Sequence, residues 1–173
     1  MDLPIEIPGH LVVETLTATQ SMNVPDGEID DDAIKTAANI GAGKLTHRYP
    51  LNYAQADGAD VVTETQILGI MYKAGSLVAV RVVPTTAPDT SAGKQYTVDI
   101  QKSTAAGAFA TVLSSVVTVD DSSTDLTVQA AVLSGSNTHI AGDVYRAVIT
   151  ASGSSGNQGQ GLGVTAIIEE NGT

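Results

Sequence analysis

The stretch Tyr96-Thr-Val-Asp-Ile-Gln101 alternates apolar and polar residues at every step. A period of two places Tyr96, Val98 and Ile100 on one face of a β-strand and the polar residues on the other. Short runs rich in Val, Thr and Ala follow one another from Gln66 to Glu170, with Gly, Ser and Asp turns between them. No helix-period segment separates these runs, which argues against parallel sheets with crossover helices. The sequence therefore predicts an all-β body.

The number and spacing of the runs narrow the choice of fold class further. Gln66–Tyr72 and Leu77–Pro84 are separated by Lys73-Ala-Gly-Ser76, which predicts a β-hairpin. Leu77–Pro84 and the last run, Gly161–Glu169, are densely apolar, so we expect both at central positions in the sheets. About eight short strands at this spacing predict an antiparallel β-sandwich that is jelly-roll-like, with a barrel as the alternative.

The region before the body has a different character. Asp30 or Asp31 suits the N-cap of a helix, and Gly41 suits the position after its C-terminus, so a short helix is expected near 31–40. Residues 10–19 form an alternating run that fits either a strand or an extended arm paired with a neighbouring molecule. The predicted organisation is an N-terminal arm with one short helix, residues 1–53, followed by a β-sandwich body, residues 54–173.

Composition excludes several classes of partner. The chain has 173 residues, enough for one domain with an appendage, and 42% of them are hydrophobic. A formal net charge of −11 opposes binding to DNA or RNA, because nucleic-acid affinity rests on cationic side chains. The N-terminus is acidic where a signal peptide is basic, and no apolar run approaches the ~20 residues of a membrane helix. We expect synthesis in a cytoplasm, and neither nucleic acid nor membrane as a partner.

Motifs for catalysis or cofactor binding are incomplete in this sequence. Gly41-Ala-Gly-Lys44 lacks the glycine spacing and the following Ser or Thr of a phosphate loop. Gly153–Gly163 leads into a predicted strand, whereas a dinucleotide fingerprint leads into a helix. There is no cysteine, and the three histidines His10, His47 and His139 fall in separate segments. We therefore predict no enzymatic activity, no cofactor and no metal site.

One segment concentrates residue types that favour interfaces. Lys44-Leu-Thr-His-Arg-Tyr-Pro-Leu-Asn-Tyr53 brings together two tyrosines, a histidine and an arginine. Tyr and Arg are enriched among the residues that dominate binding energy at protein interfaces. The candidate interface residues are Lys44, His47, Arg48, Tyr49 and Tyr53. In the alternative, Tyr49 and Tyr53 begin the first strand of the body and cover one end of the sandwich.

Several segments resemble the capsid decoration proteins of tailed bacteriophages, which are also called cement or head-fibre proteins. The segments are Lys44–Tyr49, Asn52–Gly58, Val82–Pro88, Tyr96–Lys102 and Gly153–Gly161. The resemblance spans about Ile29 to Glu170, while residues 1–26 match the pattern poorly. It implies a non-enzymatic virion protein, commonly a homotrimer. Such a protein sits on the outer surface of the phage head, binds the major capsid protein and stabilises the shell.

Two other classes compete with this expectation. A receptor-binding or carbohydrate-binding module of a phage fibre or adhesin also fits a β-sandwich, because fold alone does not fix function. Sugar platforms generally use exposed aromatic faces, and this chain has no Trp, one Phe and five Tyr. An enzyme is the weakest class, because no nucleophile, acid pair or metal set is positioned by the sequence.

Overall fold

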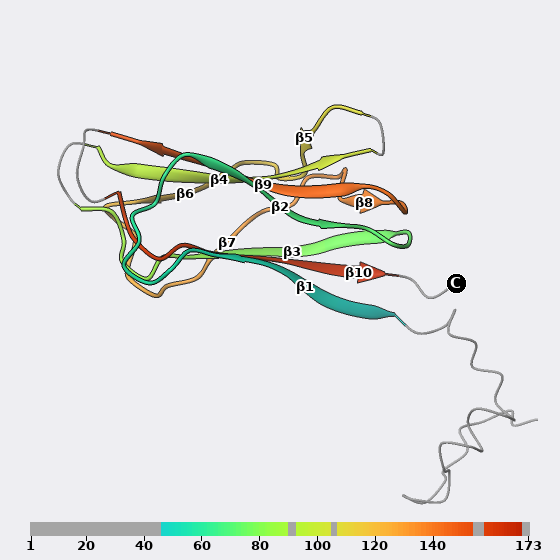
Figure 1. Cartoon of the computed structure of the whole chain (residues 1–173), viewed down its shortest axis with the longest axis horizontal. Coiled ribbons are helices and arrows are strands. Elements are labelled where there is room, and N and C mark those ends of the chain that lie inside the picture. The colour runs from blue at the N-terminus through green and yellow to red at the C-terminus, as the bar shows by residue number, and fades with distance from the viewer. Residues whose placement is uncertain (1–45, 90–92, 105–106, 154–157, 171–173) are drawn as a thin grey trace, which may run out of the picture. The chain divides into compact units, whose positions relative to one another are not determined.

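The computed structural model describes residues 46–89, 93–104, 107–153 and 158–170. These residues form ten strands and no helix, arranged as two antiparallel sheets (Figure 1). The expected helix at 31–40 and the alternating run at 10–19 lie outside the described residues. The described strands all belong to one unit of the chain, Gly41–Thr173.

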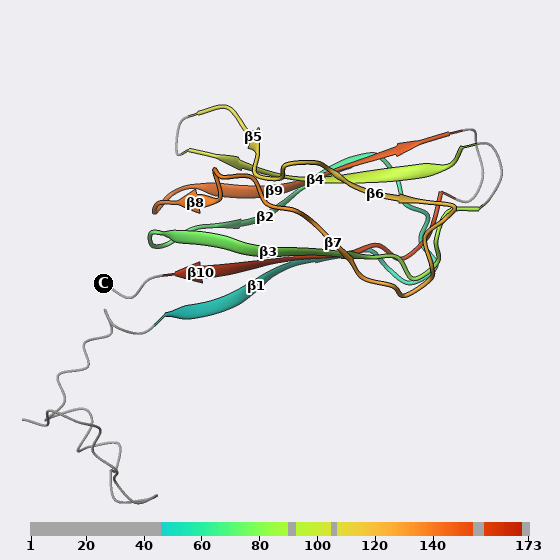
Figure 2. The same cartoon turned by 180° about the vertical axis from the view of Figure 1, so that it is seen from behind.

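Each sheet contains five of the described strands. The first sheet has the order β1 (His47–Ala54), β10 (Gly163–Glu170), β3 (Gly75–Val83) and β7 (Gln129–Ala130), and β8 (Thr138–His139) also pairs with β3. The second sheet has the order β2 (Glu64–Ile70), β9 (Val144–Ser152), β4 (Gln95–Ser103) and β5 (Ala110–Thr111), and β6 (Val117–Asp120) also pairs with β4. The two sheets lie face to face, as both views show (Figures 1 and 2).

The order of the strands defines a jelly roll. The chain places β1 in the first sheet, β2 in the second, β3 in the first and β4 to β6 in the second. It then returns to the first sheet for β7 and β8, and ends with β9 in the second and β10 in the first. Repeated crossing between two antiparallel layers is the jelly-roll arrangement. The predicted fold class, an antiparallel jelly-roll-like sandwich, is confirmed.

The predicted hairpin is wrong, although both of its strands exist. β2 pairs with β9 and β3 pairs with β10, so the chain between β2 and β3 crosses from one sheet to the other. A turn signal fixes where the chain reverses but not which strand it pairs with afterwards. The expected central positions are confirmed, because β10 and β3 are neighbours in the middle of the first sheet.

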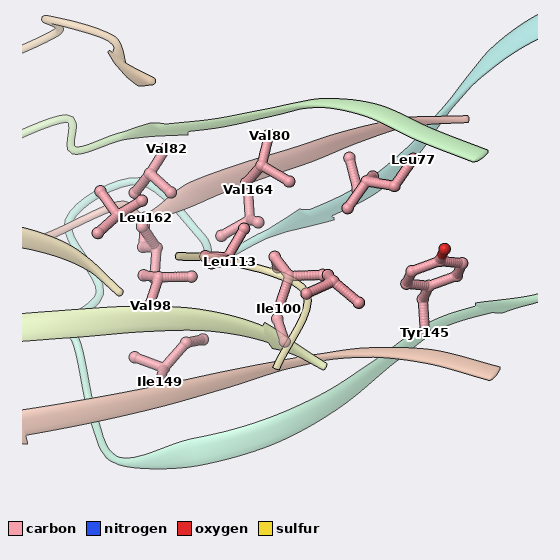
Figure 3. Packing of buried hydrophobic residues seen from close by; sticks show 14 of the residues in the cluster. Leu77, Val80, Val82, Val98, Ile100, Leu113, Tyr145, Ile149, Leu162 and Val164 are labelled. Atoms are coloured by element: carbon pink, nitrogen blue, oxygen red, sulfur yellow. The ribbon is translucent and has the colours of Figure 1, made fainter. Parts of the chain in front are cut away.

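The core lies between the two sheets. Tyr96, Val98 and Ile100 of β4 are fully buried, as their alternation predicts. Figure 3 shows side chains from β3 and β10 pointing toward those from β4 and β9. Burying one such aliphatic side chain contributes about 1.5–3 kcal/mol. The largest fully buried side chains include Leu77, Val80, Val82, Val98, Ile100, Tyr96, Tyr145 and Ile149.

The first strand belongs to the body. β1 pairs with β10 along its whole length, from His47 opposite Glu170 to Ala54 opposite Gly163. The alternating side chains Tyr49, Leu51 and Tyr53 are half-buried and pack against the core. Residues 47–53, which the sequence predicts to lie in the arm, are therefore part of the first sheet, and the body begins earlier than residue 54. The physical reason is that these three alternating residues carry enough apolar surface to complete the sheet.

Candidate interaction surface

Charged and polar side chains are exposed at the start of β1, an edge strand of the first sheet. Arg48 is exposed, and its guanidinium pairs with Glu169 on β10, with Nη2 2.5 Å and Nε 2.6 Å from the same carboxylate oxygen. His47 is exposed beside it. An ion pair in this setting contributes at most about 1 kcal/mol to stability, because water screens the charges. The pair therefore fixes the position of the Arg48 side chain more than it stabilises the fold.

Tyr49 points inward from the same strand. Its hydroxyl donates to Glu170 Oε1 at 2.7 Å and lies 3.9 Å from Met71 Sδ. Burial raises the pKa of Tyr49, and the hydrogen bond to Glu170 and the negative charge of that carboxylate raise it further. The phenol is therefore held in its neutral form, as a donor to a carboxylate within the chain.

Tyr53 closes the edge between the two sheets. Its hydroxyl donates to Glu64 Oε1 on β2, and Gln55 Nε2 donates to the same oxygen at 3.0 Å. Gln66 Nε2 donates to the other oxygen of Glu64 at 2.8 Å. Burial, together with the bond to Glu64, raises the pKa of Tyr53 to about 12. Burial raises the pKa of Glu64, but the bonds from Tyr53, Gln66 and Gln55 outweigh it and hold that pKa below its usual value.

Replacing Tyr53 with Phe should loosen this edge. The substitution removes the hydroxyl that joins β1 to β2 and keeps the ring against the core. We expect a loss of about 1 kcal/mol in the free energy of unfolding, the usual net value of one hydrogen bond. The pKa of Glu64 should rise, because one of its three donors is lost. NMR titration of Glu64 and urea denaturation measure both effects, and Tyr72→Phe, at an exposed position, is the control.

The candidate interface residues thus separate into two groups. Tyr49 and Tyr53 face the core and bond to carboxylates of the same chain, as in the alternative that they begin the first strand of the body. His47 and Arg48, the first two residues of β1, are both exposed, on opposite faces of the strand. Lys44 lies outside the described residues. A contact with a partner through this segment stays a prediction, and the described part of it is the exposed pair His47 and Arg48.

A buried polar cluster lies between the sheets beside β8 and β9. His139 Nδ1 is 3.2 Å from the hydroxyl of Tyr145, which donates to the carbonyl of Asn137 at 3.3 Å. The two rings meet edge to face, with centroids 5.7 Å apart. Asp143 Oδ2 accepts from the amide of Ile140 at 3.1 Å and lies 3.7 Å from Lys102 Nζ. The cluster fastens the turn between β8 and β9 to β4.

Part of this cluster is buried without hydrogen-bond partners. Nε2 of His139 and Oδ1 of Asp143 have none among the described residues. A buried polar atom without a partner carries a desolvation cost of about 1–3 kcal/mol. The described residues contain no group of three or more His, Cys, Asp or Glu side chains able to hold a metal ion. The sequence singles out His139 only as an isolated histidine, because its contacts come from residues on other strands.

The buried histidine should make the fold sensitive to acid. Burial lowers the pKa of His139, the charges of Glu170 and Asp143 raise it, Lys102 lowers it, and the net shift is downward. The unfolded chain therefore takes up this proton first as the pH falls. The stability linked to His139 is complete above the unfolded pKa of about 6.5 and is lost as the pH falls through the folded value.

Thermal unfolding of the native chain and of His139→Gln between about pH 7 and pH 5 tests this expectation. The melting temperature of the native protein should fall across this range, and that of His139→Gln should fall less. The pKa of Glu64 is lowered in the folded state, so this carboxylate loses its contribution to stability only below its ordinary pKa of 4.5, outside the range compared. Equal slopes for the two proteins would contradict the assignment.

In one run of alternating residues, the apolar side chains face solvent and not the core. Leu126, Val128, Ala130 and Val132, here called the β7 stripe, face solvent, with 71%, 52% and 66% of Leu126, Val128 and Val132 exposed. Of the intervening residues, Gln129 and Ala131 are half-buried and Thr127 is exposed. The sequence alternation shows that the two faces of this run differ. It predicts that the apolar face is buried, and the structure shows that this face is exposed.

Backbone pairing fixes the outward direction of the β7 stripe. Ala130 lies opposite Arg81 of β3, and the amide of Ala131 donates to the carbonyl of Val80 at 3.1 Å. The amide of Ser114 donates to the carbonyl of Val132 at 2.9 Å, which ties the run to the chain between β5 and β6 (Figure 2). A shift of one residue would exchange the two faces, and these bonds prevent it.

A second apolar surface lies on the outer face of the second sheet. Ile67 and Ile70 of β2 are 60% and 57% exposed. Ile70 lies opposite Val144 of β9, and Ile67 lies opposite Arg146. Alternation along β9 places Val144, Arg146 and Val148 on the same side, half-buried. These five residues are here called the β2–β9 face.

Arg146 is held in place at the centre of the β2–β9 face. Its guanidinium lies 3.8 Å from the centroid of the Phe109 ring, and Nε and Nη2 donate to Gln101 Oε1 at 3.0 and 2.7 Å. A guanidinium over an aromatic ring gains about 0.5–1 kcal/mol at an exposed site. The face therefore combines aliphatic side chains with a positioned arginine, a residue type enriched among those that dominate interface energies.

No protein-family model and no curated protein matches this chain. Among solved structures, a chain titled turnip yellow mosaic virus is similar over 91% of this chain and 89% of its own length, with 11% sequence identity and a TM-score of 0.33. Within the described residues, no helix has the length and apolar character needed to cross a membrane.

Proposed function

We propose that this chain is a non-enzymatic virion structural protein, a capsid decoration or cement protein of a tailed bacteriophage. It is made in the host cytoplasm and binds the outer surface of the assembled head as a homotrimer, with the major capsid protein as its partner. Its sequence segments resemble that family, as described above. The structural observation that carries the proposal is a jelly roll that presents two fixed apolar surfaces to solvent, because contiguous exposed apolar surface marks an interaction site.

The proposed mechanism is differential binding. A trimer that touches several capsid subunits at once binds the assembled shell and has little affinity for separate subunits. Anything that binds one state of an equilibrium preferentially stabilises that state by mass action. The shell therefore withstands heat and internal pressure better when the chain is bound, and no covalent bond is made or broken.

The test compares purified heads of the phage that encodes this chain with heads from the same phage lacking the gene. We expect the chain on the outside of the intact heads by cryo-electron microscopy, and DNA release from the deleted heads at a lower temperature. Adding the purified full chain to deleted heads should restore both properties. Heads that lack the chain in both preparations, or equal release temperatures, would overturn the proposal.

A second candidate is a receptor-binding or carbohydrate-binding module of a phage fibre or adhesin. The observation that favours it is Tyr72, which is 85% exposed at the end of β2 and offers an aromatic face to a ligand. A glycan array probed with the native chain and with Tyr72→Ala separates this candidate from the first. A specific glycan that the native chain binds and the variant does not would favour the binding module.

A further inference from the structure

Glu170 and His139 flank Gly75 on the core side of the first sheet. Gly75 of β3 pairs with Glu170 of β10 on one side and with His139 of β8 on the other. A β-carbon at Gly75 would lie 2.9 Å from both Glu170 Cα and His139 Nε2. Glu170 also continues the alternation of the fully buried Ala166 and Ile168, so its side chain leaves β10 toward the core. Because Gly75 has no side chain, the imidazole and the glutamate lie next to each other.

The hydrogen bonds of His139 show which of its nitrogens takes up a proton. The hydroxyl of Tyr145 has one hydrogen, which it donates to the carbonyl of Asn137, so its oxygen accepts from Nδ1 of His139. The neutral imidazole therefore carries its hydrogen on Nδ1 and a lone pair on Nε2. Nε2 is buried and has no hydrogen-bond partner among the described residues. A further proton thus binds to Nε2, the nitrogen that faces Gly75 and Glu170.

Two carboxylates influence the charge of His139. Burial lowers the pKa of His139, and of the two negative charges that oppose this effect, that of Glu170 acts more strongly than that of Asp143. Asp143 Oδ2 already faces Lys102 Nζ at 3.7 Å, whereas Glu170 Oε1 accepts from the neutral hydroxyl of Tyr49. Glu170 is therefore the acceptor for a proton on Nε2. The titratable groups around His139 and Glu170 are Tyr49 and His47 of β1, Lys102 of β4, and Asp143 and Tyr145 at the start of β9.

We propose that this end of the sandwich is a pH-operated switch. When Nε2 of His139 takes up a proton, the new N–H donates to the carboxylate of Glu170, and this carboxylate leaves the hydroxyl of Tyr49. The exchange is favoured because both partners of an imidazolium–carboxylate hydrogen bond are charged, whereas the phenol that loses its acceptor is neutral.

The switch acts at the point where the chain enters the first sheet. His47 of β1 pairs with Glu170, and the start of β1 lies beside the end of β10 (Figure 1). The bond from Tyr49 to Glu170 joins these two strands on the core side. On the outer side they are joined by Arg48 and Glu169, an exposed pair that contributes little to stability. Acid therefore loosens the start of β1 while the centre of the sandwich stays closed, whether or not the chain decorates phage heads.

The first part of the test is an NMR titration of the full chain, from neutral pH downward until His139 is protonated. The nitrogen signals of His139 should show the hydrogen on Nδ1 at the start. At the midpoint of the His139 titration, the carboxyl signal of Glu170 and the Cζ signal of Tyr49 should both change. Neither should change at that pH in His139→Gln. A Tyr49 signal that does not follow the protonation of His139 would overturn the proposal.

The second part compares Glu170→Gln with Glu169→Gln. The first substitution removes the charge beside Nε2, and the second removes the neighbouring carboxylate, which pairs with Arg48 on the outer side. The proton affinity of His139 should fall roughly tenfold in Glu170→Gln and stay unchanged in Glu169→Gln. Circular dichroism checks that both variants are folded, and Glu170→Ser replaces Glu170→Gln if it is not. Equal proton affinities of His139 in the two variants would show that Glu170 is not its partner.

Amide hydrogen exchange measures the loosening of β1. The protection of the Tyr49 and Leu51 amides, corrected for the pH dependence of the exchange chemistry, should fall about fivefold as His139 is protonated, the effect of one lost hydrogen bond. The amides of Val98 and Ile100 on β4 should keep their protection. In His139→Gln both pairs of amides should stay protected. Native β1 amides that remain equally protected after His139 is protonated would mean that no strand is loosened, and the switch would be wrong.

Discussion

Leu77→Ala is expected to remove a large part of the stability of the sandwich. Leu77 is completely buried on β3 and points from the first sheet into the core, opposite side chains of the second (Figure 3). Truncating a buried leucine to alanine costs about 2–5 kcal/mol, because the transfer free energy is lost and a cavity remains. We expect about 3 kcal/mol. The hydrogen bonds between the Leu77 backbone and Asn137 do not depend on the side chain and should persist.

Urea denaturation at neutral pH measures this loss. The matched control is Ile140→Ala, which shortens an aliphatic side chain that is 61% exposed, and its effect should stay within about 0.5 kcal/mol. A loss of less than about 1 kcal/mol for Leu77→Ala would mean that this part of the core is not closely packed. Similar losses for the two variants would contradict the burial of Leu77 between the sheets.

Gly75→Ala should be the second large effect. A β-carbon at Gly75 would lie 2.1 Å from the carbonyl oxygen of Glu169 and 2.9 Å from both Glu170 Cα and His139 Nε2. Two of these atoms belong to the backbone of β10, so the start of β3 must move away from it. Overpacking of this kind costs about 1–3 kcal/mol, and we expect the upper part of that range because backbone must shift.

Gly135→Ala is the control for this substitution. No atom lies within 4 Å of a β-carbon at Gly135, and its φ is not in the left-handed region. Alanine there should leave stability unchanged or raise it by up to about 1 kcal/mol, since it restricts the unfolded chain. Thermal unfolding of both variants decides the matter. A Gly75→Ala protein as stable as the native one would show that β3 and β10 do not approach so closely.

Sequence alternation predicts the strands of this protein well where one face is buried. Tyr96, Val98 and Ile100 are inside as expected, and the apolar density of β3 and β10 places them correctly at the centre. The pairing of strands is harder to predict from the sequence, because a period of two describes one strand and carries no information about its neighbour. The predicted hairpin between β2 and β3 fails for this reason.

The surfaces were harder to predict than the core. The alternation from Leu126 to Val132 shows that the two faces differ, but only the bonds to β3 and to Ser114 decide which face is outside. The tyrosines of β1 illustrate the opposite case. Tyr49 and Tyr53 are of a residue type that is common at interfaces. Their hydroxyls instead donate to Glu170 and Glu64, acceptors that are distant in the sequence and so could not be predicted from it.

The position of β10 between β1 and β3 has a consequence for how the chain acquires its fold. Arg48 of β1 and Glu169 of β10 meet although 121 positions separate them in the sequence. β9 likewise lies between β2 and β4, so each sheet is completed by a strand that the ribosome makes late. Folding rates fall as contacts become less local, and closing such long loops costs entropy before any contact compensates it. Synthesis therefore leaves β1 and β2 without their partner strands until β10 and β9 have emerged, and completion of both sheets should be slow.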